Sequence, residues 1–333
     1  MGKRKLTDQQ KKRIQIIQER RIKKAEKVAE QAEQMFDESQ LGMEEKGLVV
    51  ARHGASVDVE DDNHKPHFCY IRQNIHNLVP GDRVLWRASE TNNGIVTAHL
   101  PRNTVLERPN FHGYPKPIAA NVTQMIIVFA PKPEPSADLI NKYLVAAELL
   151  HIKPLIILNK KDLLPAKHPI HQWLTIYRTL NYPVIEASIK DESSVRQIQQ
   201  ELKNQTSIFL GQSGVGKSSL VSAFMPKNDI KIGALSEATG FGKHTTSTAR
   251  LYHIPTGGDL IDSPGVRNFT LWDITPIELL KGFIECKPYI SQCKFNDCTH
   301  LHEPDCAITQ LYENKEISDM RFASLQTILR SLL

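Results

Sequence analysis

Two short motifs occur in this chain in an order that few folds allow. Residues 211–219 (GQSGVGKSS) fit the P-loop pattern G-x-x-x-x-G-K-[ST], and residues 159–162 read NKKD. An apolar run precedes the P-loop and a predicted helix follows it, which is the strand–turn–helix setting of a phosphate-binding loop. In ordinary GTPases the N-K-x-D element comes after the P-loop, whereas here it ends 49 residues before Gly211. This reversal sharply narrows the families to which the chain can belong.

Length, net charge and the lengths of apolar runs limit the class of protein to which this chain can belong. The chain has 333 residues, enough for two or three domains, and a net charge of +5. Most of that charge lies in residues 1–35, which carry eleven Lys or Arg against five Asp or Glu. The sequence contains no apolar run of about 18 residues and no signal-peptide pattern, so we expect a cytoplasmic protein without a membrane segment.

The pattern of apolar runs predicts four segments. The basic tail, 1–45, is either a solvated helix or an RNA-contacting arm. Short apolar runs separated by Gly, Asn and Asp predict a small antiparallel β-barrel over 46–112, of the OB or the SH3-like type. Apolar strands that alternate with helices predict an α/β domain with a parallel sheet over 113–280. Residues 281–333 combine a Cys/His cluster with a helical tail.

The P-loop and NKKD predict a guanine-nucleotide site. Converging backbone N–H groups and the Lys217 amine suit phosphate oxygens, and the Asp162 carboxylate can accept two hydrogen bonds that guanine donates and adenine cannot. A weaker motif, EAS at 186–188, matches a loop that contacts guanine O6. The predicted nucleotide-binding residues are Asn159, Lys160, Lys161, Asp162, Ala187, Ser188, Gly211, Gln212, Ser213, Gly214, Val215, Gly216, Lys217, Ser218, Ser219, Thr245 and Thr246.

The residues around the γ-phosphate come from two later segments. Asp262 and Gly265 form the D-x-x-G element, whose carboxylate reaches Mg²⁺ and whose N–H senses the γ-phosphate. Thr245 and Thr246 are both placed to join Ser218 on Mg²⁺; we assign Thr246, although the sequence alone does not separate them. Val266 stands where Ras-like enzymes have a water-orienting Gln, so His244 is the candidate for holding the attacking water. The alternative for His244 is a surface histidine without that role.

A second site is predicted by Cys293, Cys298, His300 and Cys306. Three thiolates and an imidazole can close a tetrahedral Zn²⁺ shell, which leaves no position for a catalytic water. The alternatives are a group of reduced, partly buried cysteines, or a shell that uses His302 as its fourth ligand. The expected cofactors are therefore one structural zinc ion, and Mg²⁺ that arrives with GTP.

The order NKKD, EAS, GQSGVGKSS, GKHTTS, DSPG resembles that of the circularly permuted ribosome-assembly GTPases of the RsgA (YjeQ) family, from about residue 45 to the end. The resemblance implies a circularly permuted P-loop GTPase domain between an OB-type barrel and a zinc module, and it favours His300 over His302. It also implies a monomer that binds the 30S subunit and its 16S rRNA late in maturation and hydrolyses GTP to GDP under the control of that particle. The alternative is a P-loop NTPase or kinase that acts on a small acceptor.

Overall fold

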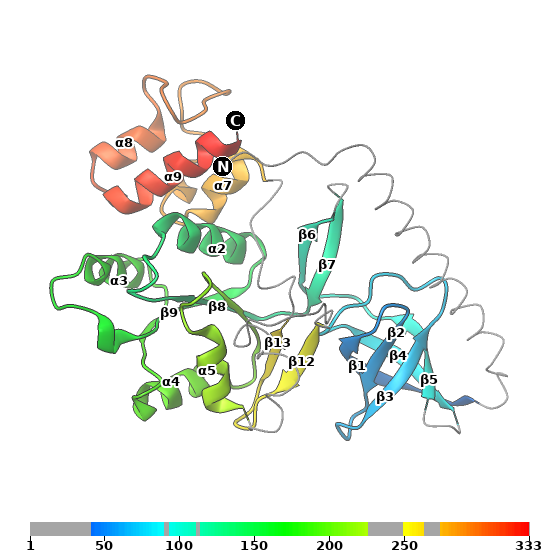
Figure 1. Ribbon diagram of the computed structural model, residues 1–333. Helices are drawn as coiled ribbons and strands as arrows, with labels where there is room; N and C mark the ends of the chain where they lie inside the picture. The colour runs from blue at the N-terminus through cyan, green and yellow to red at the C-terminus, as the bar shows by residue number, and fades with distance from the viewer. Residues whose placement is uncertain (1–40, 90–92, 111–113, 226–248, 263–273, 333) are drawn as a thin grey trace, which may run out of the picture. The chain divides into compact units, whose positions relative to one another are not determined.

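The chain divides into two compact units, residues 1–102 and 103–333, and each is described by itself. The computed structural model describes residues 41–89, 93–110, 114–225, 249–262 and 274–332 (Figure 1). Segment 1–40, interpreted as a solvated helix or an RNA-contacting arm, lies outside these residues, so its role stays a prediction. The domain boundaries drawn from the sequence also stay predictions. No described helix combines the length and apolar character that crossing a lipid bilayer requires.

The first unit contains a closed five-stranded barrel, as its short apolar runs predict. The strands hydrogen-bond in the order β1-β2-β3-β5-β4, and β4 returns to β1. Because β3 and β5 run parallel while the other neighbours are antiparallel, the barrel fits the OB type. The strands are β1 (Leu41–Arg52), β2 (Ser56–Glu60), β3 (Pro66–Ile71), β4 (Arg83–Ser89) and β5 (Asn93–His99).

One large aromatic residue fills the barrel. Trp86 on β4 is 1% exposed and lies in a core of apolar residues, mostly valines, from the surrounding strands and from the loop before β4. Two glycines make room for its indole ring, because a Cβ at Gly47 or Gly94 would come within 3 Å of Trp86 carbon atoms. A side chain at either position would therefore force the ring to move, and we attribute both glycines to packing.

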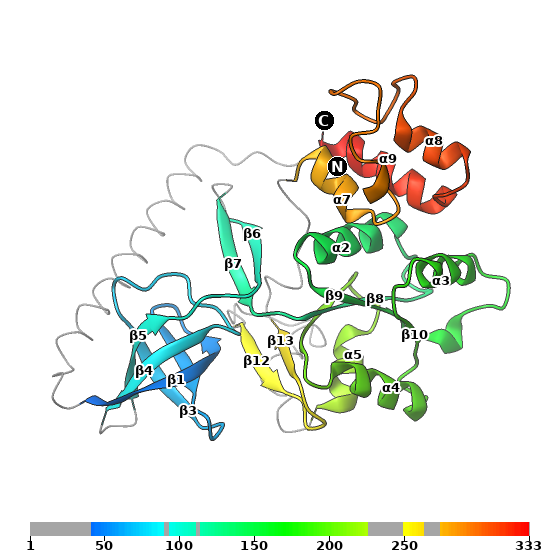
Figure 2. The same ribbon diagram turned by 180° about the vertical axis from the view of Figure 1, so that it is seen from behind.

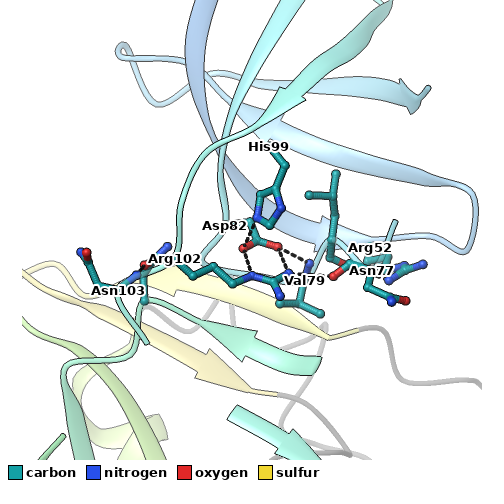
Figure 3. Close-up of polar contacts among 9 residues, drawn as sticks. Arg52, Asn77, Val79, Asp82, His99, Arg102 and Asn103 are labelled. Atoms are coloured by element: carbon teal, nitrogen blue, oxygen red, sulfur yellow. Dashed lines mark hydrogen bonds and ion pairs between the residues drawn. The ribbon is translucent and has the colours of Figure 1, made fainter. Parts of the chain in front are cut away.

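The buried carboxylate of Asp82 links the loop before β4 to residues at and after the end of β5 (Figure 3). Asp82 is fully buried and accepts hydrogen bonds from the Val79 N–H (2.8 Å) and from Arg102 Nε (2.7 Å). His99 Nε2 lies 3.0 Å from the same carboxylate, and Arg102 also donates to the Asn77 carbonyl (2.8 Å). Since a buried charge is costly unless it is paired, this network fixes the loop before β4 and the residues after β5.

The second unit is built on a six-stranded sheet in the order β10-β9-β8-β11-β13-β12. Its first five strands are parallel, as predicted, whereas β12 runs antiparallel to β13. The strands are β8 (Gln124–Phe129), β9 (Lys153–Leu158), β10 (Val184–Glu186), β11 (Thr206–Leu210), β12 (Arg250–His253) and β13 (Asp259–Asp262). The parallel strands bring the loops at their C-terminal ends to one edge of the sheet.

Helices cover both faces of this sheet (Figures 1 and 2). One face carries α4 and α5, whose Ile198 and Phe224 pack on alternate residues of β8 such as Ile126. The other face carries α2 and α3, and the side chains of Ile127 and Phe129 point that way, toward Tyr143 of α2. The four helices are α2 (Ala137–Leu149), α3 (Ile170–Thr179), α4 (Glu192–Leu202) and α5 (Lys217–Phe224).

Two proline-containing strands precede β8 and pair as a hairpin. Strands β6 (Val105–Pro109) and β7 (Pro115–Ala120) pair antiparallel as a separate two-stranded sheet. Proline usually marks the end of a strand because it cannot donate to the ladder. Here Pro109 lies opposite Pro115 at the turn end of the pairing, and the Asn110 N–H continues it by donating to the Tyr114 carbonyl (2.8 Å).

The C-terminal segment packs on α2 through the helices α7 (Pro276–Gly282) and α9 (Asp319–Leu332) (Figure 1). The third helix of this segment, α8 (Ala307–Glu313), contributes Ile308 and Leu311 to the same hydrophobic core. A Cβ at Gly282 would come within 2.4 Å of Val145 on α2, so α7 approaches α2 closely. Arg321 of α9 is fully buried; it donates to both carboxylate oxygens of Glu285 (2.7 Å each) and to Asn141 Oδ1 on α2 (2.9 Å). This fully paired charge anchors α9 on the sheet domain.

Candidate nucleotide site and metal centre

The P-loop connects β11 to α5 and depends on its glycines. Gly211 and Gly216 have φ values of +140° and +94°, which disfavour residues with a side chain. A Cβ at Gly211 would lie 2.0 Å from the Val128 carbonyl oxygen, and one at Gly216 would lie 2.4 Å from Asn159 Nδ2. The loop therefore holds its backbone against two neighbouring strands, and only glycine fits at these two positions.

The Lys217 side chain folds back over this loop. Its Nζ donates to the carbonyl oxygens of Gly211 (2.8 Å) and Gln212 (2.7 Å), so the amine lies inside the curve of the P-loop. Ser218 follows in the first turn of α5. The arrangement places a cation and a helix N-terminus together, as the sequence predicts for a phosphate site.

The NKKD segment contacts the P-loop directly. Asn159, at the end of β9, is 2% exposed and donates from Nδ2 to the Val215 carbonyl (2.9 Å). Lys160 takes a left-handed backbone conformation, with φ +59°, and its Nζ donates to the Gly214 carbonyl (2.7 Å). Two motifs that are distant and reversed in the sequence are thus joined in space, because β9 and β11 both flank β8 in the parallel sheet.

Asp162 and the EAS loop form the second half of this site. The Asp162 carboxylate accepts from Ser188 Oγ at Oδ1 (2.8 Å) and from Lys190 Nζ at Oδ2 (2.8 Å). Lys190 and then Ser188 hold the pKa of the Asp162 carboxyl below its usual range, so it is an anion at neutral pH. Ala187 fixes the two loops together, since it donates to the Leu158 carbonyl and accepts from the Lys161 N–H. The neighbouring Lys161 forms an ion pair with Asp191.

The predicted γ-phosphate residues are described only in part. Asp262 ends β13, which runs parallel to β11, so it lies at the same sheet edge as the P-loop. Gly265, His244, Thr245 and Thr246 fall outside the described residues, and so does Val266. Their assigned roles therefore stay predictions.

Three thiols and one imidazole gather in the C-terminal segment. The ligand atoms of Cys293, Cys298, His300 and Cys306 all lie within 4.8 Å of one another. His300 Nδ1 is 3.4 Å from the sulfurs of both Cys293 and Cys306, and those two sulfurs are 3.9 Å apart. A tetrahedral zinc ion with Zn–S bonds of about 2.3 Å separates its ligands by about 3.8 Å. The donor set therefore fits a metal ion, and His302 is not part of it.

The surrounding loop presents these ligands. His300 has a left-handed backbone, with φ +61°, is 8% exposed, and its carbonyl accepts from Gln326 on α9 (2.7 Å). Burial raises the pKa of the Cys298 thiol to about 12 and lowers that of His300. A bound divalent cation opposes the first shift because it favours the thiolate form. The two remaining cysteines, Cys69 and Cys286, lie buried in hydrophobic cores.

The sequence analysis missed two residues near these sites. Lys190 lies two residues after the EAS motif, and its spacing gives no sign that it meets Asp162. Arg321 occurs in a helical tail where a charged residue usually marks a solvated face, yet it is fully buried. The partner of Arg321 is Glu285, and because the two residues are far apart in the sequence, their pairing is recognised only in the fold.

Comparison with known proteins decides the family. The model of the RsgA GTPase family matches residues 99–272, more than half of the chain. The chain belongs to the RsgA GTPase family. It is therefore a GTP hydrolase, which excludes the alternative of a kinase for a small acceptor. Proteins named small ribosomal subunit biogenesis GTPase RsgA from Hahella chejuensis and Pseudomonas aeruginosa are each 45% identical to it. The alignments cover 100% of this chain, and 97% and 98% of those proteins respectively.

Solved structures of RsgA relatives confirm the fold. The crystal structure of YjeQ from Thermotoga maritima matches with a TM-score of 0.72 and 33% identity, over 87% of this chain and 99% of that one. YloQ, described as a circularly permuted GTPase, matches with a TM-score of 0.68 and 27% identity, over 87% of this chain and 95% of that one. The permuted order of motifs in the sequence thus corresponds to a known permuted fold.

Proposed function

We propose that this GTPase binds the 30S ribosomal subunit late in its maturation, and that contact with the particle stimulates hydrolysis of GTP to GDP and phosphate. The observation that carries the proposal is the bond from Asn159 to Val215, which joins a guanine-type motif to a phosphate-type loop. The names of the relatives support the small subunit as partner. The protein would act in the cytoplasm, as a monomer in contact with 16S rRNA.

The base would be held by NKKD and the EAS loop. Asp162 would accept from guanine N1–H and from the exocyclic amine, and the Lys160 stem would cover the ring. The Ala187 and Ser188 N–H groups bond the Leu158 carbonyl and Ser194 Oγ, and either would exchange that partner for O6. Adenine leaves the carboxylate without these donors, so the proposal predicts a strong preference for guanine nucleotides.

The phosphates would be held by residues 211–219. Lys217 would exchange its bonds to the Gly211 and Gln212 carbonyls for phosphate oxygens, which are stronger acceptors for an ammonium group. Mg²⁺ bound with GTP neutralises charge on the β- and γ-phosphate oxygens. Ser218 and Thr246 would hold that ion directly and Asp262 through water, while Gly265 would sense the γ-phosphate.

We also propose that the Cys/His cluster holds one structural zinc ion. All four positions of the shell are filled by protein atoms, so the ion would stabilise the loop from 293 to 306 and take no part in hydrolysis. This loop packs on α9, which is anchored to α2, so zinc would also stabilise a surface that the 30S subunit can contact.

The proposed coupling is tested by GTP turnover with purified 30S subunits and, as a control, with 50S subunits. We expect 30S subunits to raise phosphate release by well over tenfold, and 50S subunits to leave it unchanged. Equal turnover with and without 30S subunits would reject the coupling while leaving the GTPase assignment intact.

The role of His244 needs a separate variant. We expect His244→Ala to remove most of the stimulation by 30S subunits with little loss of GTP affinity, because the imidazole would hold the attacking water and not the nucleotide. Full stimulation in this variant would reject the role of the histidine only.

A further inference from the structure

The carboxylate proposed to read the base is already occupied by the protein's own chain. Ser188 Oγ and Lys190 Nζ each donate to one oxygen of Asp162 at 2.8 Å. Guanine would need oxygens of the same carboxylate for its N1–H and its amine. A serine hydroxyl contributes no charge, and Asp162 has lone pairs beyond the one that Ser188 uses. The ammonium of Lys190 is therefore the stronger competitor for the base.

The ion pair is placed so that a ligand can break it. The Lys190 side chain is 75% exposed and that of Asp162 is 31% exposed, so both charges face water once separated. Pairs of this kind change an equilibrium by about two- to fivefold. The other cations on these loops have other partners: Lys161 pairs with Asp191, and Lys160 donates to the Gly214 carbonyl. Lys190 is thus the charged group that the structure places on the carboxylate.

We propose that Lys190 is a tethered competitor of guanine at Asp162 and thereby limits the preference for guanine over adenine. This inference rests on the proposed role of Asp162 in base recognition. Guanine must displace Lys190 before it can use the carboxylate, so the lysine weakens guanine binding. Adenine has no donors for the carboxylate and leaves Lys190 in place. The lysine even lowers the penalty for adenine, because Asp162 then keeps a partner. Lys190 therefore narrows the gap between the two bases.

The first test measures Kd for GDP and ADP by calorimetry in the Lys190→Met variant. Methionine keeps the length of the side chain and removes both its charge and its N–H donors. We expect GDP to bind two- to fivefold more tightly and ADP to bind no more tightly, so that the GDP/ADP preference rises. Arg196→Met is the matched control, since it removes one cation from an ion pair with Glu192 at similar exposure. It should leave both affinities unchanged.

A double-mutant cycle separates competition at Asp162 from a general charge effect. In the Asp162→Asn background, with xanthosine diphosphate as the probe, Lys190→Met should have no effect because the ion pair is already lost. An improvement that persists in this background would overturn the proposal, and so would weaker or unchanged GDP binding in the single variant. Absence of GDP binding in the unmodified chain would reject the proposed base site itself, which is a different outcome.

Discussion

The two candidate sites are built in different ways. All four metal ligands come from one loop of fourteen residues, 293–306, which has little regular structure. The described part of the nucleotide site comes from four separate segments at the C-terminal ends of strands β9, β10, β11 and β13. One site is local in sequence, whereas the other is assembled from strands that are distant in sequence and adjacent in the sheet.

The two sites also differ in whether their polar side chains have hydrogen-bond or ion-pair partners within the protein. In the nucleotide site Lys217 bonds P-loop carbonyls, Asn159 bonds Val215, and Asp162 bonds Lys190. In the metal centre three thiols and an imidazole face one another, and no charge within the cluster compensates a thiolate. The comparison predicts that nucleotide-site variants lose activity but keep the fold, whereas metal-site variants lose local structure but keep nucleotide binding.

The largest effect is expected for Lys217→Ala. Without the ammonium, residues 211–219 lose the side-chain cation that would stabilise the charge developing on the phosphates, and hydrolysis should fall by on the order of 10³-fold or more. Phosphate release measures the loss. The thermal unfolding midpoint should change by only a few degrees, because the bonds of the ammonium to the Gly211 and Gln212 carbonyls lie within a single loop. A large drop in that midpoint would mean that the nucleotide site is not preformed by the sheet.

The next largest effect is expected for Arg321, which anchors α9 of the C-terminal segment to α2 of the sheet domain. Arg321→Met leaves Glu285 as a buried, unpaired carboxylate, which costs about 3–5 kcal/mol of folding free energy. Denaturant unfolding followed by circular dichroism measures the loss. A double variant, Arg321→Met with Glu285→Leu, should recover much of it because no charge is then left unpaired. Failure of this recovery would mean that packing of Arg321 over the Phe283 ring, at 4.2 Å, is the main contribution.

The third effect is a change of base preference in Asp162→Asn. GTP should bind on the order of 100-fold more weakly, and xanthosine triphosphate should bind better, because the amide can donate to the O2 that replaces guanine's amine. Competition binding with a fluorescent nucleotide measures both affinities. An unchanged preference for GTP would show that Asp162 does not read the base.

Sequence patterns predicted the parts of this molecule that local chemistry determines. The strand, loop and helix around the P-loop follow from its glycines and apolar runs, and the parallel sheet follows from the alternation of strands and helices. Helices α7 and α8 were missed because seven residues give too few turns for a clear periodicity. The bond between Lys190 and Asp162, and the burial of Arg321, depend on which loops and helices meet in space, and no short pattern encodes that.

The smallest effect on nucleotide binding is expected for a variant that disrupts the Cys/His metal centre. Cys298→Ser removes one of four ligands, so metal content measured by elemental analysis should fall well below one zinc per chain. Amide hydrogen exchange should rise across 293–306 and the contacting end of α9, because His300 then no longer holds its position next to Gln326. GDP affinity should change by less than about twofold, since the sheet positions the P-loop and NKKD independently of the metal. A matching loss of GDP affinity would show that the two sites are coupled through α2, on which the C-terminal helices pack, and that they do not fold as separate parts.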